Sequence, residues 1–185
     1  MDAIADAIRT EGPFDGVIGF SQGACAAGMV VSLLEGERRK TAFDERSSGI
    51  GGKGIGYPRS FLEGEGFVQG PLKFAVVYSG FKAPGKRYAA FYEPKIDTPV
   101  LHVLGQLDVV VEEKRARGLV EACERGQERV VMHPGGHFVP SAKPWLDAVV
   151  GFVKDCVKGS GDDGEKGGKD ALRKEESAED MDVPF

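Results

Sequence analysis

Apolar runs with the character of strands alternate along the chain with segments that have the apolar spacing of helices. The runs are continuous rather than interrupted by polar residues, which is typical of strands covered on both faces. They span residues 14–20, 72–79, 98–104 and 128–132. Helical patterns occupy residues 2–10, 22–34, 112–125 and 142–157. Strands that alternate with helices predict an α/β fold, with about four strands in one parallel sheet and helices flanking it.

Two segments do not fit this alternating core. Residues 36–70 are rich in glycine, charge and aromatic residues and lack a clear period, so we expect a surface insertion beside the site. Residues 158–185 contain few apolar residues, and we expect a disordered charged tail. The predicted organisation is therefore one domain over residues 1–157, followed by the tail.

Charge and cysteine content exclude several classes of protein. The net charge is −5, of which residues 158–185 contribute a net −4 and the rest of the chain about −1. The nearly neutral body has no basic surface of the kind that binds nucleic acid. No apolar run is long enough to span a bilayer, and the N-terminus does not have the pattern of a signal peptide. The three cysteines lack CxxC spacing, which argues against a zinc site or a disulfide framework and favours the cytoplasm.

Ser21 lies in Gly19-Phe20-Ser21-Gln22-Gly23, a G-x-S-x-G sequence between a predicted buried strand and a predicted helix. In this context the pattern is typical of a nucleophilic serine on a sharp turn. We expect the two glycines to be needed because a Cβ at either position would clash. The helix N-terminus behind Ser21 would offer backbone N–H groups to an oxyanion. The structural alternative is a close contact between helix and sheet that tolerates serine.

A nucleophilic serine needs a base, and the chain has three histidines, His102, His133 and His137. His102 lies inside the run TPVLHVL, where a buried structural imidazole is expected. His137 follows the turn Pro134-Gly135-Gly136 after the last strand, which is the place of the base in this chain order. His133 is closer to the strand, and we expect it to support the loop. The sequence therefore favours His137.

The acid that orients the base should follow an earlier strand at the same edge of the sheet. Asp108 comes directly after the run at 98–104. Asp97 precedes that run and would lie at the opposite edge, whereas Asp147 belongs to the last helix. Asp108 is therefore the candidate acid, and a helix cap or turn residue is its structural alternative.

The other motifs of the chain do not indicate a catalytic or binding role. The stretch GIGGKGIG at 49–56 departs from the phosphate-loop pattern, because glycine follows Lys53. Cys25 is expected to be a small core residue. Trp145, Leu146 and Val149 are expected on the core face of the last helix.

Four blocks of the chain, taken together and in order, resemble the FSH-type serine hydrolases of the α/β-hydrolase superfamily. They are GPFDGVIGFSQGA, KFAVVYSGF, PVLHVLGQLD and HPGGHFVP. The resemblance implies an α/β-hydrolase-like fold, with Ser21, Asp108 and His137 as the triad and the Gln22 N–H as one oxyanion donor. It also implies a small-molecule ester or thioester substrate, hydrolysed without metal or cofactor. Some fungal members of the family release polyketide chains from a synthase.

The chain departs from this family at its start. Family members begin with a strand ending in a Leu-His-Gly type motif, whose loop supplies a second oxyanion donor. That strand has no counterpart here, so we expect an N-terminally truncated sheet, from a truncated product, an incomplete gene model or a protein completed by a partner. Residues 14–20 would then be an exposed apolar edge, through which we expect self-association. The alternative function is a non-catalytic fragment or binding module that keeps the triad without the oxyanion loop.

Overall fold

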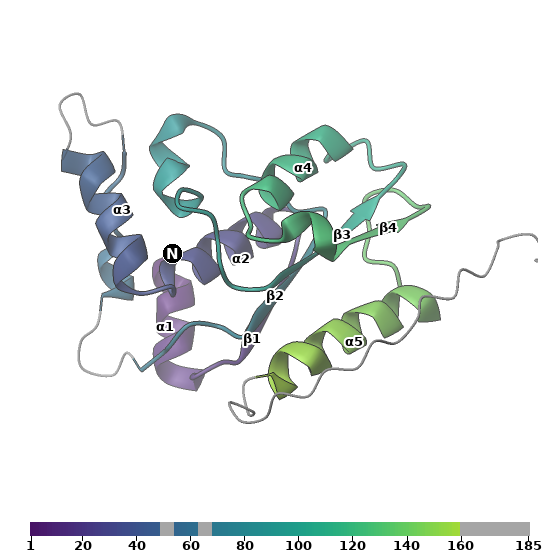
Figure 1. Ribbon diagram of the computed structural model, residues 1–185, viewed down its shortest axis with the longest axis horizontal. Coiled ribbons are helices and arrows are strands. Elements are labelled where there is room, and N and C mark those ends of the chain that lie inside the picture. Colours follow the sequence, from purple (N-terminus) through teal and green to yellow (C-terminus); the bar gives the residue numbers. More distant parts are fainter. Residues whose placement is uncertain (49–53, 63–67, 160–185) are drawn as a thin grey trace, which may run out of the picture.

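The computed structural model describes residues 1–48, 54–62 and 68–159 (Figure 1). Four strands form one sheet in the order β1-β2-β3-β4, and every neighbouring pair is parallel. The strands are β1 (Gly16–Phe20), β2 (Phe74–Tyr78), β3 (Val100–Gly105) and β4 (Val130–His133). This architecture confirms the predicted fold class. Most of residues 49–56 and nearly all of the predicted tail lie outside the described residues.

Five α-helices and three short 3₁₀ helices surround the sheet in the described part of the chain. The α-helices are α1 (Asp2–Glu11), α2 (Gln22–Leu33), α3 (Glu37–Ser48), α4 (Glu113–Glu121) and α5 (Lys143–Lys158). The 3₁₀ helices are η1 (Arg59–Phe61), η2 (Lys86–Phe91) and η3 (Gly126–Arg129). No helix among the described residues is both long enough and apolar enough to cross a membrane.

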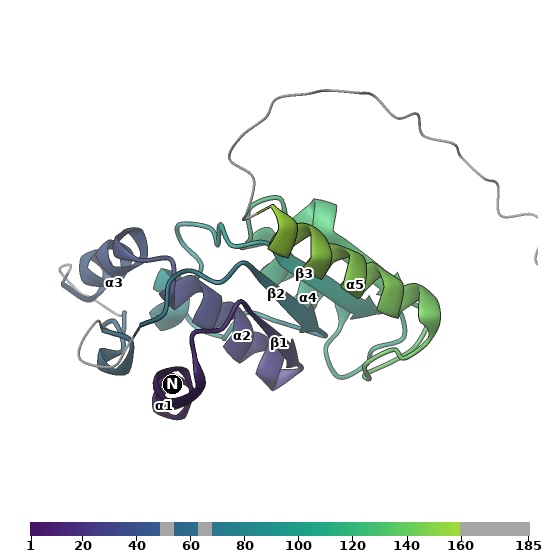
Figure 2. The same cartoon turned by 90° about the horizontal axis from the view of Figure 1, so that it is seen from below.

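Alternate side chains of β2 separate the core into two layers. Ala75 and Val77 pack in the cluster that includes α2 and α4. Phe74, Val76 and Tyr78 pack in the other cluster, on the face that α5 covers. Figure 2 shows α5 on one side of the sheet and α1 and α2 on the other. All five residues of β2 are buried, which explains why its sequence is a continuous apolar run.

Helix α5 covers its face of the sheet only partly. Val149, Phe152 and Val153 pack against buried residues of β2 and β3, while the Trp145 Nε1–H donates a hydrogen bond to the Met132 carbonyl at 3.1 Å. Leu146 is 46 % exposed, so its predicted place on the core face is wrong. The helix turns Leu146 away from the sheet because Trp145 and Val149, four residues apart, take the inward stripe.

Helix α3 lies in the segment expected to be an irregular surface insertion. Its sequence is mostly charged, but Phe43 and Arg39 are both fully buried. The Arg39 Nη1 donates to the Ala90 carbonyl at 2.8 Å, and its Nη2 pairs with Glu35 Oε2 at 2.8 Å. A buried arginine stabilised by hydrogen bonds counts as polar in any hydrophobic pattern. Helix α3 is therefore packed into the structure rather than being irregular, as was expected. The apolar pattern did not reveal this helix because one of its buried residues is an arginine.

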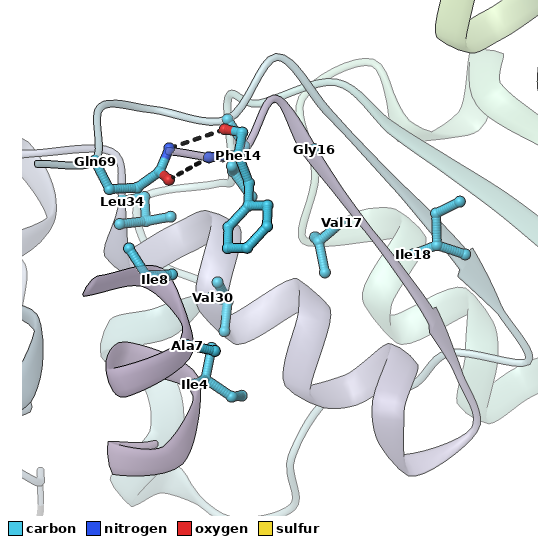
Figure 3. Close-up of a pocket in the computed structure, with 11 residues that line it drawn as sticks. Ile4, Ala7, Ile8, Phe14, Gly16, Val17, Ile18, Val30, Leu34 and Gln69 are labelled. Atoms are coloured by element: carbon cyan, nitrogen blue, oxygen red, sulfur yellow. Dashed lines mark hydrogen bonds between the residues drawn. The ribbon is translucent and has the colours of Figure 1, made fainter. Parts of the chain in front are cut away.

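Strand β1 is at the edge of the sheet, as expected, and no strand of the described residues pairs with its outer side. Ile18 is 61 % exposed there. A groove of about 270 Å³ runs between β1 and α1, with an almost entirely apolar lining (Figure 3). At its end the Gln69 side chain makes hydrogen bonds to both backbone groups of Phe14, at 2.8 and 3.0 Å.

Candidate active site

Ser21 occupies a sharp turn between β1 and α2. Its φ is 54°, a left-handed conformation that serine rarely adopts outside strained functional turns. The Ser21 N–H donates a hydrogen bond to the Tyr78 carbonyl at 2.9 Å, which connects the turn to the end of the neighbouring strand β2. The turn thus projects the hydroxyl from the carboxyl edge of the sheet.

The two glycines of the G-x-S-x-G sequence differ in their surroundings. A Cβ on Gly19 would lie 2.4 Å from the Gly23 carbonyl oxygen and 2.7 Å from the Ala24 Cα. A Cβ on Gly23 would have no atom within 4 Å. The predicted clash is therefore confirmed at Gly19 and wrong at Gly23, because α2 turns the Gly23 position toward open space.

The His137 ring connects Ser21 to Asp108. Its Nε2 lies 3.0 Å from the Ser21 Oγ, and its Nδ1 lies 2.9 Å from the Asp108 Oδ2. Because an ionised carboxylate can only accept, Nδ1 carries the proton, and Nε2 of the neutral ring accepts from the Ser21 hydroxyl. The Phe20 ring packs on the imidazole with centroids 4.8 Å apart. The structure thus brings together the three side chains that the sequence singled out.

Two loops hold Asp108 and His137 in register. The N–H groups of Gln106 and Leu107 donate to the carbonyls of His133 and Gly135, at 2.9 and 3.0 Å. A Cβ on Gly105 would lie 2.5 Å from the Gly136 carbonyl oxygen, so glycine is needed for this close approach. The loop after β4 is therefore fixed on the loop after β3 by backbone contacts.

Asp108 is 8 % exposed and holds its charge through hydrogen bonds. Its Oδ1 accepts from the N–H groups of Val110 and Val111, at 3.0 and 2.8 Å. Its Oδ2 accepts from the Ser79 hydroxyl at 2.7 Å as well as from His137. Burial raises the pKa of Asp108, but these hydrogen bonds outweigh it and lower the pKa to about 2. The carboxylate therefore remains ionised at neutral pH.

Ser79 is the polar contact of this site that the sequence reasoning missed. It follows β2 directly, has a φ of 47° and is almost fully buried. The only signal was its place in the block KFAVVYSGF, just past the end of a strand at the same edge as Ser21 and Asp108.

The other two histidines have structural positions, as expected. His102 is buried within β3, and burial, followed by the charges of Arg117 and Arg129, lowers its pKa to about 4. His133 is also buried, its Nδ1 accepts from the Gly135 N–H at 3.2 Å, and its ring packs on Phe138. His133 thus supports the loop that carries His137, and burial lowers its pKa as well.

The N–H of Gln22 is available at the start of α2. The first N–H groups of a helix have no acceptor within the helix, and this group has no other acceptor among the described residues. Gln22 and Cys25 also line a cavity of about 400 Å³ that opens beside the serine turn. Cys25 is therefore a half-buried residue of the cavity wall as well as a neighbour of the core. No group of three His, Cys, Asp or Glu side chains within the described ranges could hold a metal ion.

Comparison with known proteins identifies similar chains among fungal and animal hydrolases. Residues 1–149 match the family "Serine hydrolase (FSH1)". The chain is 35 % identical to "Family of serine hydrolases 3" of Saccharomyces cerevisiae, over 83 % of this chain and 49 % of that protein. It is 33 % identical to "Esterase OVCA2" of Danio rerio, over 83 % of this chain and 55 % of that protein.

Among solved structures, the chain resembles the acyl-protein thioesterase 2 of Zea mays with a TM-score of 0.47 and 22 % identity. That match covers 84 % of this chain and 64 % of the maize protein. The chain spans about half the length of the two curated relatives named above. The match over residues 1–149 and the identity to these hydrolases show that the chain belongs to the FSH1 family of serine hydrolases, within the α/β-hydrolase superfamily.

Proposed function

We propose that the chain hydrolyses carboxylic esters or thioesters with Ser21 as nucleophile, His137 as base and Asp108 as the acid that orients it. The observation that carries this proposal is the unbroken hydrogen-bond chain from Asp108 Oδ2 through the imidazole to the Ser21 Oγ, with distances of 2.9 and 3.0 Å. The strained turn at Ser21 and the ionised state of Asp108 support the same roles.

The reaction proceeds through an acyl-enzyme. His137 Nε2 takes the hydroxyl proton as the Ser21 Oγ attacks the carbonyl carbon, and the Gln22 N–H donates to the oxyanion that forms. The imidazolium returns the proton to the leaving alcohol or thiol as the acyl bond breaks. His137 then deprotonates a water that attacks the acyl-Ser21 ester, which releases the carboxylic acid and restores the serine. Asp108 stabilises the imidazolium in both halves without becoming protonated.

Labelling with a fluorophosphonate probe tests this proposal. The wild-type chain should be labelled at Ser21, and Ser21→Ala should abolish labelling while circular dichroism shows an intact fold. Ser141→Ala, which removes an exposed serine far along the chain, is the matched control and should be labelled like the wild type. A folded wild-type chain that resists the probe would favour a non-catalytic binding module instead.

We also propose that the chain self-associates through the outer edge of β1. The Asp15 carbonyl accepts from the Lys73 N–H, and the Ser21 N–H donates to the Tyr78 carbonyl, so both groups point to the β2 side of the strand. Backbone groups alternate in direction along a strand, so those of Gly16, Ile18 and Phe20 point to the open side. These three positions are symmetric about Ile18, and a two-fold pairing with a second copy would match Gly16 to Phe20 and Ile18 to itself.

The chain is proposed to work in the cytoplasm. All three cysteines are free, which fits a reducing compartment.

A further inference from the structure

The cavity beside Ser21 has walls from four parts of the chain. Gln22 and Cys25 come from the first turns of α2, and Phe81 comes from the loop after β2. Tyr88 and Arg87 come from η2, and Arg115 comes from the first turn of α4. The cavity is thus lined on one side by Gln22, the residue after the proposed nucleophile, and on another by Arg87 and Arg115.

Aromatic rings hold both guanidinium groups in place. The Arg115 Cζ lies 3.7 Å from the centroid of the Phe81 ring, and the Arg87 Cζ lies 4.9 Å from that of Tyr88. Stacking on a ring orders a guanidinium and leaves its N–H groups free at the edge. Neither arginine has a carboxylate partner among the described residues, and the described lining contains no Asp or Glu.

The position of Arg115 is unfavourable for a purely structural cation. It lies in the first turn of α4, where the helix dipole disfavours positive charge. Its charge also acts on the cavity floor: burial raises the pKa of the Cys25 thiol, and the hydrogen bond to Tyr92 and the charge of Arg115 oppose that rise.

The adjoining surface is positive as well. Lys82 and Lys86 line a neighbouring cavity that shares Ala83 with the first. The acidic residue of that cavity, Glu93, is already paired with Arg46 at 2.6 Å. An uncharged apolar chain placed here would desolvate guanidinium groups without giving them a partner, which is unfavourable.

We propose that this cavity binds an anionic group of the substrate, a carboxylate or phosphate carried on the acyl or the leaving-group side of the scissile bond. Arg115 and Arg87 supply the charge-assisted hydrogen bonds that recognise it. This inference rests on the proposed function, because it places the scissile carbonyl at Ser21. It assigns the protein to anionic esters or thioesters rather than to neutral ones.

Two matched substrate pairs test the proposal. Each pair compares a carboxylate with its uncharged primary amide of the same size. On the acyl side the pair is 4-nitrophenyl hydrogen adipate and 4-nitrophenyl adipamate. On the thiol side it is the S-acetyl derivative of 3-mercaptopropionate and of 3-mercaptopropanamide. We expect the carboxylate to be preferred in kcat/KM by about tenfold or more in at least one pair, as for a hydrogen bond to a charged group, and the preference to shrink as salt rises.

Substitution of the arginines should remove this preference. Arg115→Gln and Arg87→Gln should each lower the ratio of carboxylate to amide kcat/KM, and the double variant should bring it close to one. Lys114→Gln removes the same charge from the neighbouring exposed position of α4, outside the cavity lining, and should keep the wild-type ratio. An equal loss for both members of a pair would show that the arginines act only on the shape of the site, and would overturn the proposal.

A binding measurement separates this inference from the proposed reaction. The free adipamate anion has a carboxylate but no ester that could be hydrolysed. It should shift the amide resonances of Gln22 and Cys25 in NMR spectra, and Arg115→Gln should weaken this shift. Absence of such binding, or no carboxylate preference in either pair while the fluorophosphonate probe labels Ser21, would overturn the anion site alone. Failure of the probe together with normal adipamate binding would overturn the proposed reaction and keep the anion site.

Discussion

Asp108 shows how a single side chain can be prepared for its role by its neighbours. Four hydrogen bonds converge on its carboxylate, from the Val110 and Val111 N–H groups, the Ser79 hydroxyl and His137. Three of these come from groups other than the imidazole, so the carboxylate is oriented before any proton moves. Ser79 is the only other side chain in this set, and its left-handed backbone conformation is one that the surrounding structure must enforce.

Ser79→Ala should therefore reduce turnover by loosening Asp108. Loss of one charge-assisted hydrogen bond raises the pKa of Asp108 and should cost about 1–3 kcal/mol in the free energy of unfolding at neutral pH. We expect kcat/KM for a 4-nitrophenyl ester to fall about tenfold or more, with labelling of Ser21 slowed but retained. Unchanged kinetics in Ser79→Ala would contradict the positioning role.

Strand β3 illustrates an element whose stability depends on a buried titratable group. His102 is 1 % exposed, and its Nε2 has no hydrogen-bond partner in the described structure. The folded state therefore holds this ring neutral, with a pKa of about 4 against 6.5 for the free side chain. The strand is covered on both faces, so the imidazole cannot be solvated without opening the sheet.

This buried ring predicts acid sensitivity of the fold. Between pH 6.5 and pH 4 the unfolded chain binds a proton at His102 that the folded chain does not, so the free energy of unfolding falls as pH falls, by up to about 1.4 kcal/mol per pH unit. Above pH 6.5 the group contributes no pH dependence, because both states are neutral. His102→Leu should flatten the decline in melting temperature over this range, measured by circular dichroism. An equally steep decline in the variant would place its cause elsewhere, with His133 the next candidate.

At the scale of the whole molecule, the open edge of β1 distinguishes this chain from a sheet closed on both sides. No strand in the described part of the chain pairs with the outer backbone groups of this edge, and Ile18 is exposed along it. The ion pair of Asp15 with Lys73 lies at the beginning of the edge. Natural sheets usually protect such an edge with charge, proline or a covering segment. Within β1 there is neither a charged residue nor a proline.

Self-association through this edge should respond to charge placed at its centre. Ile18→Lys should shift the chain toward monomer in sedimentation velocity experiments at increasing protein concentration, because two lysines would face each other across the two-fold axis. Val150→Lys also replaces an exposed aliphatic residue by lysine, on α5 away from this edge, and should associate like the wild type. A wild-type chain that is monomeric at all concentrations would contradict the proposed pairing.

Much of the fold could be predicted from local sequence patterns, because strands and helices follow from the spacing of apolar residues within a few positions. All four strands and four of the five α-helices of the described residues lie where the apolar pattern indicated them. The candidate site could be predicted in part for the same reason: Ser21, Asp108 and His137 each follow a strand, and parallel strands present their carboxyl ends at one edge.

Only the tertiary structure decided which contacts complete the site. The hydrogen bond of Ser79 to Asp108 joins residues 29 positions apart, and the contact of Gly105 with Gly136 joins two different loops. The buried Arg39 that anchors α3 donates hydrogen bonds to the carbonyls of Ala90 and Lys95, more than 50 positions away, and a buried arginine does not show in an apolar pattern. The placement of Arg87 and Arg115 around one cavity has the same origin. Local sequence sets the elements, whereas contacts between distant residues exist only once the chain is folded, and these fix the orientation and charge of the candidate site.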